Sequence, residues 1–156
     1  MPLRNELKLN KPFTLEWHEE LLNICLTSAR NKKRGAEFLK PHGLTDVQFN
    51  LMLLLKHQPG EEEGLSQARI SEMMLVNRAN ITSLIDRMEK AGYVVRTAAD
   101  GDRRYNIIKL TAKGRKLTDK VEPIYAKEVT RIMSPLNKSE RLKLTAMLEK
   151  IRAGMK

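Results

Sequence analysis

Residues 93–110 have the pattern of two short strands around a tight turn, and this feature constrains the fold most. Residues 93–96 form a short segment with β-branched residues and predict a first strand. Asp100-Gly101-Asp102 is typical of a turn, and residues 104–110 predict a second strand. A two-stranded hairpin is not stable alone in water, so it must pack on other elements. Since the flanking sequence is helical in pattern, we predict a mainly α fold with a small antiparallel β-hairpin.

Three helices are predicted directly before this hairpin. The first begins at a capping box formed by Thr45 and Gln48 and is apolar on nearly every side, as expected of a central core helix. Ser66 caps a short second helix, and Asn77 caps a third that ends at Gly92. The third helix has an apolar face at the spacing i, i+3, i+4 and i+7, made of Ile81, Leu84, Ile85 and Met88. Two short helices followed by a hairpin predict a winged helix-turn-helix.

Long amphipathic helices are predicted on both sides of this unit. One covers residues 14–39 and ends at Pro41-His42-Gly43, another begins after Thr111 and contains Pro123, where a kink or break is expected, and the last covers residues 137–151. Apolar faces on such terminal helices stay exposed unless a partner covers them, which favours a homodimer. We therefore divide the chain into an N-terminal arm and dimerisation helix (1–43), a winged helix-turn-helix (44–115) and C-terminal dimerisation helices (116–156).

The side of the third helix opposite its apolar face carries small and hydrogen-bonding residues. Such a face suits the major groove, where Arg donates to guanine and Asn pairs with adenine. The candidate DNA-binding residues of this helix are Arg78, Ala79, Asn80, Thr82, Ser83 and Arg87.

The hairpin tip supplies a second candidate contact with DNA. Asp102, Arg103 and Arg104 follow a glycine turn, and an arginine held there can lie in a neighbouring minor groove. We expect Asp102 to orient Arg104 through an ion pair.

Charge and composition restrict the partners. The chain has 29 basic and 19 acidic residues, a net charge of +10, which favours a polyanion: nucleic acid first, an anionic membrane surface second. Aromatic residues are only 4%, which argues against stacking platforms for single strands. A lone cysteine, Cys25, fits a reducing compartment, and the sequence shows neither a secretory signal nor an apolar run long enough to span a membrane, so we expect a cytoplasmic protein.

Three stretches resemble the MarR (multiple antibiotic resistance regulator) family of transcription factors. They are residues 44–49 at the start of the core helix, residues 81–94 over the third helix and its exit, and residues 102–104 with 109–114 over the wing and the next helix. The resemblance implies a homodimer that reads a palindromic operator in double-stranded DNA, with Arg104 as the wing arginine and Asp102 as its partner. Many members have arginine where this chain has Ser83, so base contacts are expected to shift to Arg78, Asn80 or Thr82.

The family resemblance also implies a repressor that a small phenolic or anionic effector releases from DNA. Trp17, His42 and Met52 are candidate lining residues of an effector crevice, although their alternative roles are plain core or surface positions. Cys25 is interpreted as structural rather than redox-active, and we predict no metal and no cofactor.

The sequence bears differently on two other function classes. An architectural or RNA-binding basic protein, which binds by charge with little sequence preference, is the alternative. An enzyme is not expected, because the sequence has no Gly-rich phosphate loop, no nucleophile elbow and no paired His–Cys metal-ligand spacing.

Overall fold

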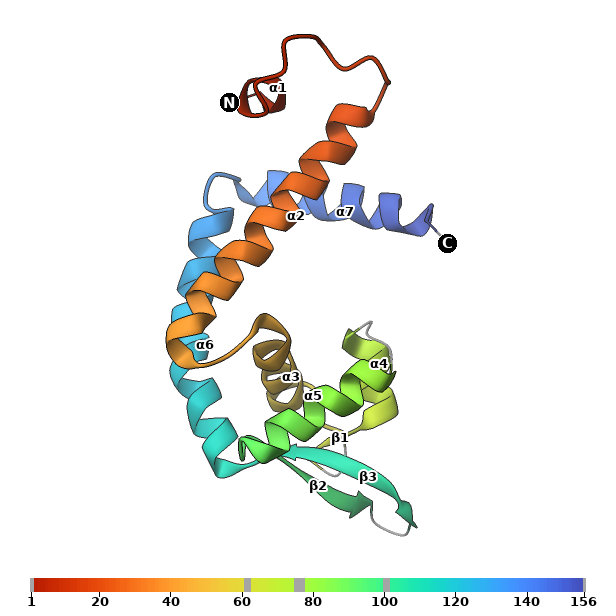
Figure 1. Cartoon of the computed structure of the whole chain (residues 1–156), viewed down its shortest axis with the longest axis vertical. Helices are drawn as coiled ribbons and strands as arrows, with labels where there is room; N and C mark the ends of the chain where they lie inside the picture. Colours follow the sequence, from red (N-terminus) through yellow and green to blue (C-terminus); the bar gives the residue numbers. More distant parts are fainter. Residues whose placement is uncertain (1, 61–62, 75–77, 100–101, 156) are drawn as a thin grey trace.

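The computed structural model describes residues 2–60, 63–74, 78–99 and 102–155, with the side chains of residues 78, 99 and 102–105 excepted. Figure 1 shows an elongated molecule in which α3, α4, α5 and a small sheet form the lower part. The long helices α2 and α6 rise from it, and α7 crosses the upper part. The element bounds are α1 Leu3–Glu6, α2 His18–Leu39, the 3-10 helix η1 Lys40–His42, α3 Asp46–His57, β1 Leu65–Ser66, α4 Gln67–Met74, α5 Arg78–Lys90, β2 Val94–Ala99, β3 Asp102–Leu110, α6 Ala112–Met133 and α7 Lys138–Ala153.

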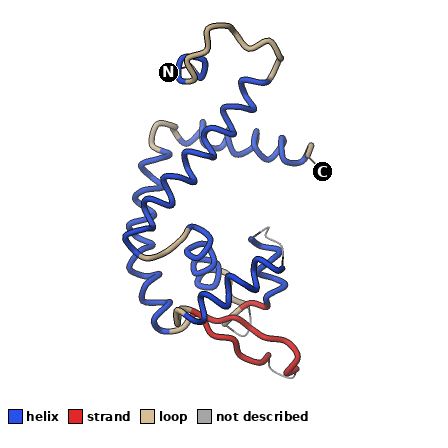
Figure 2. Tube along the Cα trace, viewed as in Figure 1, coloured by secondary structure: helices blue, strands red, loops and turns tan. Residues whose placement is uncertain are grey.

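The predicted mainly α fold with a small β-hairpin is confirmed, with one additional strand. The sheet has the antiparallel order β1-β3-β2, and it appears as the red segment in Figure 2. The short β1 pairs Leu65 with Ile108, next to Gly64. A Cβ at Gly64 would lie only 2.6 Å from the Ile108 carbonyl oxygen, so this glycine permits the close approach of β1 to β3. Ser66, predicted as a helix cap, ends β1 and accepts a hydrogen bond from the Arg69 backbone at 3.2 Å.

Helix α3 forms the centre of the core, as its sequence predicted. Its capping box is present, with Gln48 N donating to Thr45 Oγ1 at 3.3 Å and Thr45 N donating to Gln48 Oε1 at 2.9 Å. The buried core also includes all of the predicted anchoring face of α5, each residue at most 3% exposed. Its main members are Phe49, Leu51, Met52, Leu55, Ile70, Ile81, Leu84, Ile85, Met88, Val94, Ile108 and Val121.

The start of α6 is locked against the end of α5. Gly92 has φ +72°, a left-handed conformation that suits a helix C-terminus, and its carbonyl accepts a hydrogen bond from Thr111 Oγ1 at 2.6 Å. Gly114 lies so close to Tyr93 that an added Cβ would be 2.1 Å from the Tyr93 carbonyl oxygen. The hairpin and α6 are therefore held at one junction.

The long helices differ in detail from their predicted bounds. Helix α2 begins at His18 rather than near Thr14, because Trp17 has a left-handed backbone with φ +63°. The short α1 was not predicted. Helix α6 runs through Pro123 as one helix of 22 residues, so the break allowed for at that position does not occur.

Candidate nucleic-acid interface

Helix α5 separates its residues into a buried and an exposed side. Ile81 and Ile85 are fully buried, and Leu84 and Met88 complete the anchoring face. The exposed side carries the predicted contact residues whose side chains the structure describes, namely Ala79, Asn80, Thr82, Ser83 and Arg87, together with Asp86. The backbone of Arg78 forms the start of α5, but its side chain lies outside the described part. Five of the six predicted helix residues thus share one exposed surface.

A residue of α4 contacts this exposed surface. Gln67, the first residue of α4, donates a hydrogen bond from its amide nitrogen to Thr82 Oγ1. Gln67 is half-buried, whereas Thr82 is exposed. The contact joins both helices of the helix-turn-helix at the surface expected to face DNA.

An arginine of the wing binds two carboxylates in the C-terminal half of α5. Arg96 on β2 forms ion pairs with Asp86 and Glu89 of α5, and its backbone N–H donates to Glu89 Oε1 at 3.0 Å. Burial disfavours the charged form of Arg96, but hydrogen bonds and charge from Asp86 and Glu89 outweigh it and raise the pKa of the guanidinium above its usual value. Arg96 therefore holds the wing against α5 and stays charged.

The wing itself is formed by β2 and β3, which continue toward the predicted tip. Val94 pairs with Leu110, and the ladder shifts register between Ala98 and Ala99 before Ala99 pairs with Asp102. The backbones of Asp102, Arg103 and Arg104 belong to β3. Their side chains and residues 100–101 lie outside the described part, so the ion pair between Asp102 and Arg104 stays a prediction.

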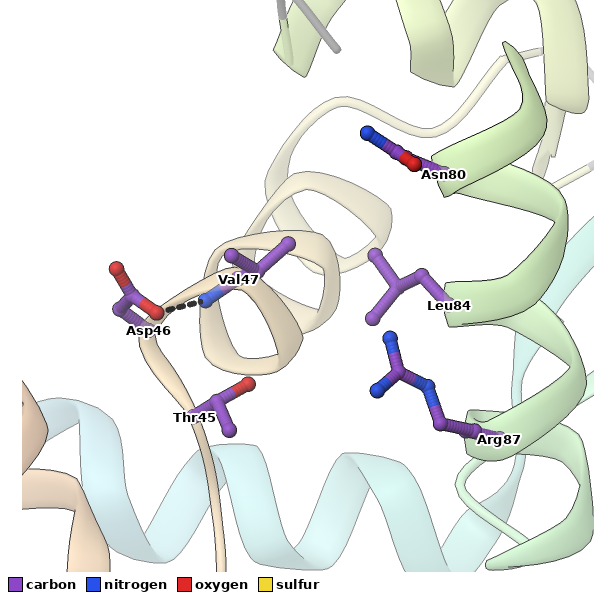
Figure 3. A pocket seen from close by; sticks show the side chains of 6 residues that line it. All are labelled: Thr45, Asp46, Val47, Asn80, Leu84 and Arg87. Carbon is purple, nitrogen blue, oxygen red and sulfur yellow. Dashed lines mark hydrogen bonds between the residues drawn. The ribbon is translucent and has the colours of Figure 1, made fainter. Parts of the chain in front are cut away.

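A cavity of about 360 Å³ lies between the start of α3 and the exposed side of α5. In Figure 3, Val47 and Leu84 face each other across it, while the Arg87 guanidinium extends from α5 toward Thr45. Arg87 Nε donates to the Ser83 carbonyl at 3.2 Å. Thr45, Asp46, Val47, Asn80, Leu84 and Arg87 line the cavity. It combines one guanidinium with apolar walls next to the candidate DNA contacts.

The three predicted effector residues have different surroundings. Trp17 is 75% exposed just before α2, Met52 is fully buried in the core, and His42 lies against the Phe38 ring at 5.9 Å between centroids. None of the three lines the cavity at Arg87. Cys25 is a free, exposed cysteine of α2. Among the described residues, no group of three or more His, Cys, Asp or Glu side chains is arranged to hold a metal ion.

Sequence reasoning missed two residues of this surface. Gln67 could not be identified from the sequence, because its contact with Thr82 joins two helices and depends on the turn between them. Arg96 gave a readable signal: it is a cation in a β-branched strand, and Asp86 and Glu89 lie three residues apart on the helix packed against that strand.

Comparison with known proteins identifies the family. A MarR family model matches residues 42–104, which cover most of the winged helix-turn-helix. The uncharacterized HTH-type transcriptional regulator YkoM of Bacillus subtilis is 32% identical over 142 residues, which are 88% of this chain and 90% of YkoM. The chain belongs to the MarR family. The predictions of this family and of a DNA-binding transcriptional regulator are thereby confirmed.

Two solved structures of proteins bound to DNA have the same fold. The transcriptional repressor CouR, bound to a 23-mer DNA duplex, is 30% identical with a TM-score of 0.74, covering 91% of this chain and 99% of CouR. MepR of S. aureus, in complex with DNA, has a TM-score of 0.77 at 23% identity and covers 86% of this chain and 96% of MepR; at that identity the likeness concerns the fold alone. None of the described helices of this MarR family chain has the length and apolar character needed to span a lipid bilayer.

Proposed function

We propose that this MarR family chain is a cytoplasmic, non-enzymatic repressor that binds a palindromic operator as a homodimer and is released by a small anionic effector. One observation carries the proposal. The apolar side of α5 is buried, and its opposite side presents hydrogen-bonding residues beside a β-ribbon. This arrangement suits a helix that enters the major groove while the hairpin reaches the adjacent minor groove.

The candidate contact residues have separate roles. On α5, we assign Arg78 and Asn80 to base edges, with Thr82 beside them, and Ala79, Ser83 and Arg87 to the surrounding groove and phosphates. At the wing, we assign Arg104 to the minor groove, Asp102 to the orientation of Arg104, and Arg103 to the phosphate backbone.

Exposed apolar side chains on the long helices support the homodimer. Six large apolar residues of α2, α6 and α7 are between 38% and 57% exposed, which is unfavourable in water unless a second subunit covers them. They are Leu21, Ile124, Val129, Ile132, Met147 and Ile151. We accordingly assign residues 1–43 and 116–156 to dimerisation and residues 44–115 to DNA binding.

The cavity at Arg87 supports an anionic effector. An aromatic carboxylate placed there would pair its charge with Arg87 and its ring with Val47 and Leu84. Because Arg87 also belongs to the proposed DNA surface, such a ligand would compete with DNA for the same cation.

The decisive experiment compares two DNA probes. The wild-type protein selects a duplex from a randomised library, and its affinity for this operator is measured against random duplex at physiological salt. We expect a ratio of about 10³ or more. A ratio near one would instead favour the architectural alternative, in which binding depends on charge alone. Benzoate, titrated into the operator complex, tests the effector: dissociation is expected for wild type and not for Arg87→Met.

A further inference from the structure

We infer that Gln67 is a specificity-determining residue that reads a base from α4, with its amide held in position by Thr82 of α5. This inference rests on the proposed function, because it needs the exposed side of α5 to face the major groove. The single contact that carries it is the hydrogen bond from the Gln67 amide nitrogen to Thr82 Oγ1.

The position of Gln67 follows from the fold. It is the first residue of α4, directly after Ser66, which caps the Arg69 backbone N–H and is bonded into the sheet as part of β1. The backbone of Gln67 is thus fixed on both sides by the sheet and the helix. Since its side chain meets Thr82 on the exposed side of α5, Gln67 lies at the same surface as the predicted base contacts.

The chemistry of the amide selects a base. A glutamine amide has two N–H donors and one carbonyl acceptor, and one N–H is directed at Thr82. Within the described residues, the second N–H and Oε1 of Gln67 have no hydrogen-bond partner. These two groups lie side by side and match adenine, which offers the N7 acceptor and the N6 donor in the major groove. Thr82 thereby sets which edge of the amide faces outward, so that the pair acts as one reading unit.

Substitutions of Gln67 test this assignment against a selected operator. The probes are the duplex that wild type selects from a randomised library and its single-base variants. Gln67→Met has nearly the same shape, and we expect it to lower the preference for one A·T pair in each half-site by roughly 5- to 150-fold without changing affinity for random duplex. Gln67→Glu is expected to shift that position toward cytosine, whose N4 donates to a carboxylate. Glu72→Gln on the same helix, expected to keep the base preference, is the matched control.

The role of Thr82 is tested in the same assay. Thr82→Val removes the hydroxyl at constant shape and is expected to relax the same A·T position. In the Thr82→Val protein, Gln67→Met should change the base preference less than it does in wild type, because the Thr82 hydroxyl no longer holds the Gln67 amide. Thr82→Ser, which keeps the hydroxyl, should retain the preference. An unchanged melting temperature for each variant shows that the fold is intact.

The remaining outcomes distinguish failure of this inference from failure of the proposed function. If Gln67→Met weakens all duplexes equally, Gln67 contacts a phosphate and the inference is wrong; if it changes nothing, the inference is also wrong. If Asn80→Ala or Thr82→Val alters base preference while Gln67→Met does not, the proposed function stands without this inference. If wild type selects no sequence from the library, the proposed function itself fails.

Discussion

Arg96 and Glu89 are joined twice, once through the Arg96 backbone N–H and once through its guanidinium, so that one residue of the wing is fixed to one residue of α5. Asp86 binds the same guanidinium one turn earlier on α5. Polar contacts of a single arginine thus add to apolar packing in holding the wing against α5.

Replacement of Arg96 should weaken DNA binding more than folding. Arg96→Met removes both ion pairs and leaves Glu89 with unpaired charge at a partly buried site. We expect a loss of stability of about 1–3 kcal/mol, measured by urea denaturation. We also expect a loss of affinity for the operator, because the wing is no longer held at the correct angle. Arg96→Lys restores a charge but not the fork that reaches both carboxylates, so it should recover stability only in part. Wild-type affinity in Arg96→Met would show that the wing does not depend on this clamp.

Gly114→Ala tests the junction between the hairpin and α6. The added methyl group would lie 2.1 Å from the Tyr93 carbonyl oxygen, and backbone atoms there have little room to move. We expect destabilisation of about 3 kcal/mol. Gly35→Ala on α2 is the control, since a Cβ there meets nothing within 4 Å. That change should stabilise the helix by roughly 0.5–1 kcal/mol. Equal thermal unfolding midpoints for the two variants would show that Gly114 is not tightly packed against Tyr93.

The ion pairs that tie α3 to α6 predict a pH dependence of stability. Lys56 Nζ lies 2.6 Å from both Asp119 and Glu122, which raises the pKa of Lys56 above 10.5, and the hydrogen bond from Lys56 in turn lowers the pKa of Glu122 below 4.5. The Glu122 contribution is present above about pH 4.5 and is lost as pH falls through its folded pKa. The Lys56 contribution is present below pH 10.5 and is lost as pH rises through its folded pKa.

Comparison with Lys56→Met measures this contribution. Because His57 also contacts Glu122, both proteins carry His57→Gln. We expect the free energy of unfolding at neutral pH to be about 1 kcal/mol higher with Lys56 than with Met at this position. This difference between the two proteins should shrink at both extremes of pH. A difference that stays constant from pH 3 to pH 7 would show that the carboxylates do not act through Lys56.

A charged residue on the apolar face of α7 should dissociate the proposed homodimer. Met147 is 57% exposed and lies on the same side of α7 as Ile151. Met147→Glu places a charge where a second subunit is expected, and burial of an unpaired carboxylate is costly. Sedimentation velocity is expected to give a monomer at concentrations where wild type is dimeric. Leu142→Glu, on the polar side of the same helix, should leave the dimer intact; dissociation by both variants alike would argue against a defined interface.

A substitution at the wing should change affinity without changing sequence preference. Arg104→Ala is expected to weaken binding to most duplexes and to reduce the slope of log K against log salt, because one phosphate or groove contact is lost. Asn80→Ala should instead relax preference at one or two operator positions by roughly 1–3 kcal/mol. Filter binding across a salt series separates the two. Unchanged affinity in Arg104→Ala would show that the wing assignment is wrong.

The sequence predicted those parts of the fold that depend on local pattern. The spacing of Ile81 and Met88 places the core side of α5, and Thr45 places the start of α3, because periodicity and capping act within a few residues. The two-residue strand β1 was missed, since two residues carry no period. The cavity between α3 and α5 was also missed, because Val47 and Arg87 line it together only after these two helices have packed.

Helix α6 connects the winged helix-turn-helix to the long helices in the upper part of the molecule. One end is wedged at Gly114 against Tyr93, and near the other end Glu128 binds Arg34 of α2. With 22 residues, the helix is about 33 Å long, and a tilt of about 5° at one end displaces the other by roughly 3 Å. That displacement is as long as a hydrogen bond. We expect that a change of this size in how two subunits meet would move the wing relative to a bound operator by about the length of one hydrogen bond.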